Sequence, residues 1–256
     1  MECYTEAMDR KHLIIVVAIA IVCFVAGYWL ATPAKKAIAP ENGVAAHVIS
    51  IRDTTSSQLY KITGEYPQFD AAASNVNVAI ANYVSSALTQ FKSDAVANQQ
   101  AREATMPAGL KDALPPQSFY FTTNWEPEQI NSRYISIIVR IEYFDGGANE
   151  TQLLKTFNYD VTNKKIMSLA DLFPNVPNYL SQIAQLSQQE LTSSLTNASQ
   201  GHLALDILKE GTAPTSDNYA NFTFNDDVVS IYFPKYQVAP GVFGEQKTGI
   251  VRSTVR

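Results

Sequence analysis

Apolar and polar residues alternate along three central segments of the chain, residues 119–125, 135–143 and 153–159. One face of the second segment carries the apolar side chains Ile135, Ile137, Val139, Ile141 and Tyr143. Its opposite face carries Ser136, Arg140 and Glu142. This alternation predicts antiparallel strands that bury one face. The sequence Asp145-Gly146-Gly147 predicts the turn between the second and third strands.

Further strands are predicted at both ends of this central block. Residues 44–54 and 59–66 are partly alternating and predict an N-terminal strand pair, with Pro67 ending the second strand. Residues 219–224, 228–233 and 249–255 predict strands at the end of the chain, the first two joined by an Asn/Asp turn.

Helical spacing of apolar residues predicts one long helix and several shorter ones. Residues 74–101 carry apolar side chains at three- and four-residue steps, and either Asp70 or Ser74 could serve as the N-cap. Ser168 with Asp171 has the spacing of a capping box before a short helix. Residues 177–196 and 203–208 predict two more helices. The order of strands and helices predicts an α+β fold, with an antiparallel sheet packed by helices.

Residues 13–31 form a run of nineteen uncharged residues near the N-terminus. A helix of this length spans about 28 Å, which suits a bilayer. Arg10 and Lys11 precede the run, and Tyr28 and Trp29 stand at its far end. We therefore predict a transmembrane signal-anchor, the alternative being a signal peptide cleaved after Ala34.

The predicted anchor defines the expected organisation of the chain. Residues 1–12 would be a short cytoplasmic tail and residues 32–43 a linker. Residues 44–116 and 117–256 would be the N-terminal and C-terminal parts of a domain outside the cytoplasm, on a single-pass protein of the cell membrane.

Composition narrows the classes of function. The chain has 256 residues, 46% of them hydrophobic and 17% charged, which suits a folded protein with a core. The net charge of −5 gives no basic footprint for nucleic acid. After residue 31 there are 21 Asp and Glu against 17 Lys and Arg, an excess that favours a basic protein partner.

Cysteine and histidine usage offers little chemistry. Cys3 and Cys23 leave the outer part of the chain without a disulfide. His12, His47 and His202 lie far apart and form no ligand pair. No phosphate-binding loop or nucleophile motif is present in the sequence. We therefore expect no metal, no cofactor, no catalytic residues and no enzymatic activity.

Three blocks of sequence resemble a known bacterial family in their order and spacing. They are RYISIIVRIEYFDGGAN, TFNYDVTNKKIMSLADLF and FTFNDDVVSIYFPKYQVAPGVFG, with ITGEYPQF and VNVAIANYV resembling the small domain that precedes them. Together they resemble the RsiV-like extracytoplasmic domain, which is shared by lysozyme-binding anti-sigma factors and some peptidoglycan deacetylases. The resemblance covers roughly residues 45–252.

The resemblance implies an envelope-tethered domain that binds a lysozyme-like wall hydrolase or peptidoglycan. The chain departs from the family in three ways, and each limits which family properties can be expected of it. The twelve N-terminal residues are too few for a sigma-binding segment, and the chain lacks the length and histidines for a deacetylase's metal-binding domain. Asn149 stands where family members often have a histidine after the Gly-Gly-Ala turn.

Two turns are candidate binding surfaces. The first contains Asp145, Gly146, Gly147 and Asn149, and the second contains Tyr232, Tyr236 and Gln237, which could present a flat aromatic and amide surface. For both turns the alternative is a purely structural need for Gly and Pro.

Asp226 and Asp227 resemble a carboxylate pair, but adjacent turn residues point apart and favour a solvated turn. The sequence thus predicts a membrane-anchored, extracytoplasmic binding module of the cell envelope. The alternatives are a structural envelope component and an unrecognised wall-modifying hydrolase.

Overall fold

The structure is a computed structural model, and it describes residues 44–52, 59–70, 73–107, 119–198 and 204–256. These residues all fall in one compact unit of the chain. The predicted tail, transmembrane helix and linker lie outside the described residues. Within the described ranges, no helix is both long enough and apolar enough to cross a membrane.

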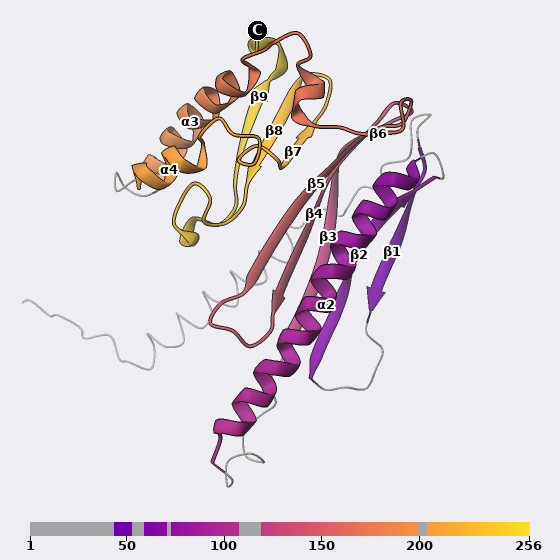
Figure 1. Ribbon diagram of the computed structural model, residues 1–256, viewed down its shortest axis with the longest axis vertical. Coiled ribbons are helices and arrows are strands. Elements are labelled where there is room, and N and C mark those ends of the chain that lie inside the picture. Colours follow the sequence, from indigo (N-terminus) through magenta and orange to yellow (C-terminus); the bar gives the residue numbers. More distant parts are fainter. Residues whose placement is uncertain (1–43, 53–58, 71–72, 108–118, 199–203) are drawn as a thin grey trace, which may run out of the picture. The chain divides into compact units, whose positions relative to one another are not determined.

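A six-stranded sheet forms the first half of the unit (Figure 1). Its strands lie in the order of the sequence: β1 (Ala46–Arg52), β2 (Tyr60–Phe69), β3 (Phe119–Ile130), β4 (Tyr134–Phe144), β5 (Thr151–Asp160) and β6 (Lys165–Ile166). The predicted strand pair and all three central strands are confirmed. β2 and β3 pair in parallel, however, and every other neighbouring pair is antiparallel. The sheet is therefore mixed, which corrects the expectation of a purely antiparallel one.

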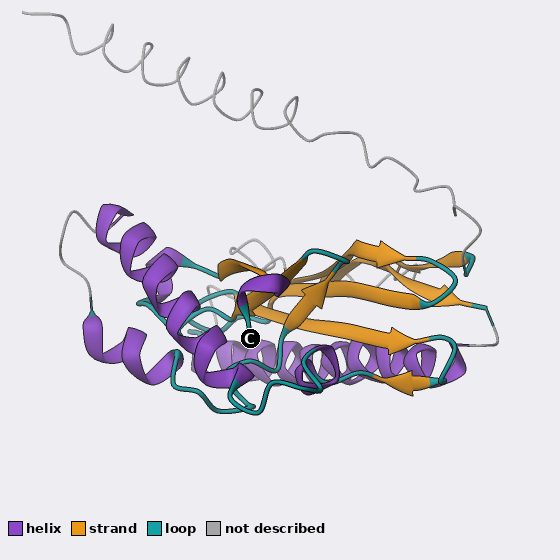
Figure 2. Ribbon diagram, turned by 90° about the horizontal axis from the view of Figure 1, so that it is seen from above, coloured by secondary structure: helices purple, strands orange, loops and turns teal. Residues whose placement is uncertain are grey.

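The parallel pair follows from the helix between its strands. Helix α2 (Ser74–Thr105) links β2 to β3 and lies along one face of the sheet in Figures 1 and 2. A long helix between neighbouring strands returns the chain to the same end of the sheet, as a parallel pair requires. Fully buried residues of α2 include Val76, Ile80 and Phe91, and they pack on the alternating apolar residues of β3 and β4.

The helix begins without the expected side-chain cap. Its N-cap is Ala73, which makes no side-chain capping bond. Instead, Asn77 accepts a hydrogen bond from the Phe69 amide and donates one to the Phe69 carbonyl, both at 2.8 Å. This double contact fastens the start of α2 to the end of β2.

Pro67 does not end β2, which continues to Phe69. The pairing of β2 with β3 covers only Tyr60–Gly64, so the missing amide hydrogen of Pro67 breaks no bond on that side. Edge positions tolerate proline for this reason.

The second half of the unit is a small three-stranded antiparallel sheet with its own core. Its strands are β7 (Phe222–Phe224), β8 (Val228–Phe233) and β9 (Gln246–Val251). Helices α3 (Tyr179–Ala198) and α4 (Leu205–Gly211) contribute Ile183, Leu191 and Leu208 to this core. β7 is shorter than predicted, because residues 219–221 are not in a strand. β9 begins and ends earlier than predicted, because residues 252–254 form a short 3-10 helix.

The predicted capping box is confirmed. Ser168 donates to Asp171 Oδ2 from both its amide and its hydroxyl, each at 2.7 Å, at the start of a 3-10 helix, Leu169–Leu172. The helix is tighter and shorter than an α-helix, and its residues Leu169 and Leu172 enter the second core.

A buried polar seam joins β7 to the face of the large sheet opposite α2. Ser136 and Thr156 accept bonds from the amides of Phe224 and Phe222, both at 2.9 Å. Asn158 donates to the Phe222 carbonyl and accepts from Ser136, both at 2.7 Å. Because β7 covers only this end of the face, the residues further along β4 and β5 stay partly open.

Candidate functional site

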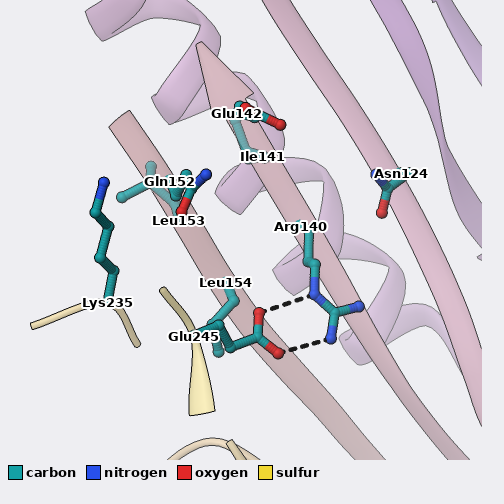
Figure 3. A pocket seen from close by; sticks show the side chains of 9 residues that line it. All are labelled: Asn124, Arg140, Ile141, Glu142, Gln152, Leu153, Leu154, Lys235 and Glu245. Carbon is teal, nitrogen blue, oxygen red and sulfur yellow. Dashed lines mark hydrogen bonds and ion pairs between the residues drawn. The ribbon is translucent and has the colours of Figure 1, made fainter. Parts of the chain in front are cut away.

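The open part of the sheet face holds a groove of about 180 Å³ (Figure 3). Ligand sites that enclose a small molecule usually measure roughly 300–1,000 Å³. The groove therefore suits one unit of a longer ligand. Its polar lining consists of Asn124, Arg140, Glu142, Gln152, Lys235 and Glu245. Ile141, Leu153 and Leu154 complete it.

Strand pleating explains how these side chains meet. Arg140 and Glu142 are two residues apart on β4, so they point to the same face, away from α2. In the register of the sheet Arg140 lies between Asn124 on β3 and Leu154 on β5, while Glu142 lies beside Gln152. Lys235 and Glu245 come from the loop between β8 and β9.

Arg140 is the centre of an ion-pair network. Its Nε and Nη2 donate to the two carboxylate oxygens of Glu245, at 2.9 and 2.8 Å. Its Nη1 lies 3.2 Å from the Glu126 carboxylate, and its guanidinium lies 5.6 Å from the centre of the Tyr232 ring. The hydrogen bond to Glu245 raises the pKa of Arg140 above its usual value, so the charge is permanent. This network ties the β8–β9 loop to the large sheet.

Glu142 has a perturbed environment at the other end of the groove. Burial raises its pKa, and the neighbouring Glu150 raises it further through its charge and a shared hydrogen bond. Gln152 and Lys235 act in the opposite direction. Tyr120 donates a hydrogen bond to Glu150, which holds that carboxylate in place. A carboxyl group with a raised pKa is suited to giving or taking a proton.

In the first predicted turn, Asp145 and Gly146 have structural roles. Asp145 Oδ1 accepts a bond from the Gly147 amide at 3.0 Å, and the Asp145 carbonyl accepts one from Asn98, also at 3.0 Å. Gly146 has a φ of +96°, and a Cβ there would lie 2.7 Å from the Phe119 ring. Asn149 is exposed, next to Glu150. A binding role for this turn stays a prediction.

The second predicted surface is assembled differently from the expectation. Tyr232 is only 4% exposed, beneath the charges of Arg140 and Lys247, because β8 is a buried central strand. The Gln237 amide donates to the carbonyls of Gly211 and Asn218, both at 3.0 Å, and so braces the loop. Tyr236 alone is exposed, at 62%. These residues do not form one flat surface, which corrects that part of the prediction.

Asp226 and Asp227 are both exposed on the turn after β7, as expected of a solvated turn. A second hollow, of about 400 Å³ and wide open to solvent, lies between residues 172–176 and 252–255. Its Arg252 already donates to the carbonyls of Asn225 and Asp226. In the part of the chain that the structure describes, no group of three or more His, Cys, Asp or Glu could hold a metal ion.

Sequence reasoning missed Arg140, Glu142, Lys235 and Glu245 as site residues. The sequence did give a signal for Arg140 and Glu142, since both are charged residues on one face of an otherwise apolar strand. Lys235 and Glu245 carried none, because the loop that brings them over the sheet is set by tertiary contacts.

Two family models match the chain, each over less than half of its length. A model described as deacetylase PdaC matches residues 54–151. A model described as a protein of unknown function, DUF3298, matches residues 170–252. The groove draws Arg140 and Glu142 from the first matched region and Lys235 and Glu245 from the second.

One curated relative carries a functional name. The peptidoglycan-N-acetylmuramic acid deacetylase PdaC of Bacillus subtilis (strain 168) is 34% identical over 122 residues, which is 48% of this chain and 25% of the relative. The chain thus spans about a quarter of that enzyme's length. The matches relate the chain to domains associated with a peptidoglycan deacetylase, while the link to RsiV-like anti-sigma factors stays a prediction.

The comparisons correct one prediction outright. The chain was expected not to be an enzyme, but its curated relative is named as a deacetylase and the model over residues 54–151 carries a deacetylase's name. The prediction rested on the absence of familiar catalytic motifs, and such an absence does not exclude an enzyme.

Solved structures support the fold. A member of the DUF3298 family from Bacteroides fragilis superposes with a TM-score of 0.55 at 16% identity, covering 83% of this chain and 92% of that one. A DUF3298 family protein from Pseudomonas aeruginosa gives 0.53 at 13% identity, covering 82% and 91%. The mixed α+β fold with a sheet packed by helices is therefore shared with these proteins.

Proposed function

We propose that this chain is an extracytoplasmic cell-envelope protein that holds a peptidoglycan glycan strand in the groove, in the service of wall modification. The observation that carries the proposal is the groove's lining. Side-chain amides and carboxylates surround the apolar side chain of Leu154, which shares their face of the sheet, and they come from regions matched by two family models. Polar groups placed over an apolar floor are typical of sites that bind small polar units.

The relative's name directs the choice of ligand. That enzyme is named for the deacetylation of N-acetylmuramic acid in peptidoglycan. An N-acetylated sugar offers hydroxyls, an amide N–H and an amide carbonyl. Asn124 and Gln152 provide both donors and acceptors for such groups, and neither side chain is buried.

Glu142 is the groove residue best suited to proton transfer in a deacetylation. Its carboxyl lines the groove, and burial together with Glu150 raises its pKa. Hydrolysis of an acetamide needs a group that takes a proton from water and another that gives one to the leaving amine. Acetate release is accordingly the activity to measure.

The proposal is tested by calorimetric titration of the purified full-length chain with soluble peptidoglycan fragments, alongside an assay for released acetate. We expect fragment binding that is weakened at least about tenfold in Asn124→Ala and Gln152→Ala together. The control is Gln188→Ala on α3, outside the groove. Release of acetate that stops in Glu142→Gln, with binding retained, would make the groove an active site.

A titration with a lysozyme tests the protein partner that the sequence resemblance implies. Lysozyme binding combined with silence toward every wall fragment would overturn the proposal. Binding of fragments without acetate release would leave the groove as the part that holds the strand for a separate deacetylase.

A further inference from the structure

We propose that Lys235 is the residue by which the groove selects wall glycans that carry a free carboxylate. This inference rests on the proposed function, in which the groove holds a wall glycan. It adds the chemical class of ligand and the residue that recognises it.

The groove contains two cations, but only one is open to a ligand. Arg140 is already bonded to both oxygens of Glu245 and lies 3.2 Å from Glu126. A ligand carboxylate would have to displace a bidentate internal partner to reach it, which is costly. Arg140 is therefore a structural cation.

Lys235 is the open cation. Among the described residues no carboxylate lies within 4.0 Å of its ammonium, which lies 5.3 Å from the centre of the Tyr236 ring and acts on the Glu142 carboxylate only from a longer distance. It is half-buried and lines the groove with Glu142 and Gln152. In Figure 3 its side chain extends away from the Arg140–Glu245 pair.

The loop holds this lysine in place before any ligand arrives. Tyr236, the next residue, has a φ of +75°, a conformation that non-glycine residues rarely adopt. Its ring packs so closely on Gly241 that a Cβ there would lie 2.1 Å from the ring. Gln237, the residue after Tyr236, donates from its side-chain amide to the carbonyls of Gly211 at the end of α4 and Asn218 in the loop after it. Such preorganisation reduces the entropy lost on binding.

Charge also fixes where an anion can sit. Glu142 repels an anionic group and Glu245 is already paired with Arg140, so Lys235 offers the favourable position for an anion in the groove. The neutral sugar groups of the same ligand would then lie along Asn124 and Gln152. This arrangement favours a sugar chain with a carboxylate over a neutral one.

Wall glycans offer such a carboxylate from two sources. One is the lactyl group of muramic acid in strands without stem peptides, and the other is a carboxylate of the stem peptide. Both present the same chemistry to an ammonium group. Neutral oligomers of N-acetylglucosamine lack it.

The test compares three probes on the full-length chain at low ionic strength: an N-acetylglucosamine tetramer, a peptide-free N-acetylglucosamine–N-acetylmuramic acid tetrasaccharide, and the same tetrasaccharide with stem peptides. We expect the carboxylate-bearing probes to bind about five- to tenfold more tightly than the neutral tetramer. The preference should shrink as salt is added. The carboxylate-bearing probe that binds more tightly than the neutral tetramer identifies the source of the carboxylate.

Lys235→Gln should reduce this preference to within about twofold, because the carboxylate-bearing probes lose their cationic partner. Lys155→Gln is the matched control, since Lys155 is exposed on the α2 face of the sheet, beside Tyr83. If Lys235→Gln preferred the carboxylate-bearing probes as strongly as the parent chain does, or if the parent chain showed no such preference, the inference would be overturned. Glycan binding itself would still stand. Silence toward all three probes would overturn the proposed function together with it.

Discussion

The two faces of the six-stranded sheet are built from the same strands but serve different ends. On β4, Val139 and Ile141 are at most 1% exposed beneath α2. Their neighbours Arg140 and Glu142 point the other way and line the groove. One alternating segment therefore encodes a core on one face and a charged site on the other. The first face should govern stability, and the second should govern binding.

The largest stability effect is expected on the face under α2. Phe91 is fully buried and contacts the rings of Tyr60, Phe121 and Tyr143. Phe91→Ala leaves a cavity at the centre of this cluster and should lower the free energy of unfolding by about 3–5 kcal/mol. Denaturant titration measures the change.

Val78→Ala is the control on the same helix, because Val78 is 58% exposed. It should change the free energy of unfolding by less than about 0.5 kcal/mol. Equal losses in the two variants would mean that α2 does not pack on the sheet through the face described.

The next largest effect is expected at the polar seam. Asn158→Ala removes the partner of both Ser136 and the Phe222 carbonyl, two groups buried between β4 and β7. The Ser136 hydroxyl would keep its bond from the Phe224 amide but lose its acceptor, and the Phe222 carbonyl would lose its side-chain donor, which together should cost about 1–3 kcal/mol. Hydrogen exchange should show the loss at Phe222–Phe224 first, and unchanged protection there would argue against the seam as the join.

A smaller effect is expected where the groove joins the β8–β9 loop. The Arg140 and Glu245 side chains are 27% and 26% exposed, so solvent screens their pair in part. A double-mutant cycle with Arg140→Gln and Glu245→Gln should give a coupling energy of about 1 kcal/mol, decreasing with salt. A coupling of zero at low salt would show that the loop is held by other contacts.

The smallest effect concerns the pH dependence contributed by Glu142. Its pKa in the folded state is raised, so the folded chain keeps this proton to higher pH than the unfolded chain does. Ionised Glu142 therefore costs stability above the unfolded pKa of about 4.3, and the cost disappears at lower pH.

Glu142→Gln should accordingly be more stable than the parent chain at pH 7, by less than about 1 kcal/mol because the site is partly solvated, and equal to it near pH 4. Thermal unfolding at the two pH values measures this difference. Glu210→Gln, at an exposed position of α4, serves as the control and should show no such pH dependence. A stabilisation of Glu142→Gln that is larger at pH 4 would contradict the assignment.

Much of the fold was predictable from local patterns. The alternation along β3, β4 and β5, the helical spacing from Ser74 and the capping box at Ser168 each depend on nearby residues, and each is confirmed. The parallel pairing of β2 with β3 was missed because it depends on how α2 crosses the sheet. The bond pair from Asn77 to Phe69 likewise replaced the expected cap through a tertiary contact.

The site was less predictable than the fold. Tyr232 was expected at the surface on account of its residue type, but its strand lies between β7 and β9 and is buried. Glu245 meets Arg140 across 105 positions of sequence, a separation at which no local pattern gives a signal. Glu142 was visible as a charge on a strand, but its environment depends on Glu150 and Lys235, which other segments supply.

The most direct test of the account is hydrogen exchange of the full-length chain with and without a peptide-bearing peptidoglycan fragment. The account predicts added protection in peptides that cover residues 140–142, 152–154 and 234–245, with α2 unchanged. Protection confined to α2 or to β1, with those three segments unaffected, would contradict the assignment of ligand binding to the open face of the sheet.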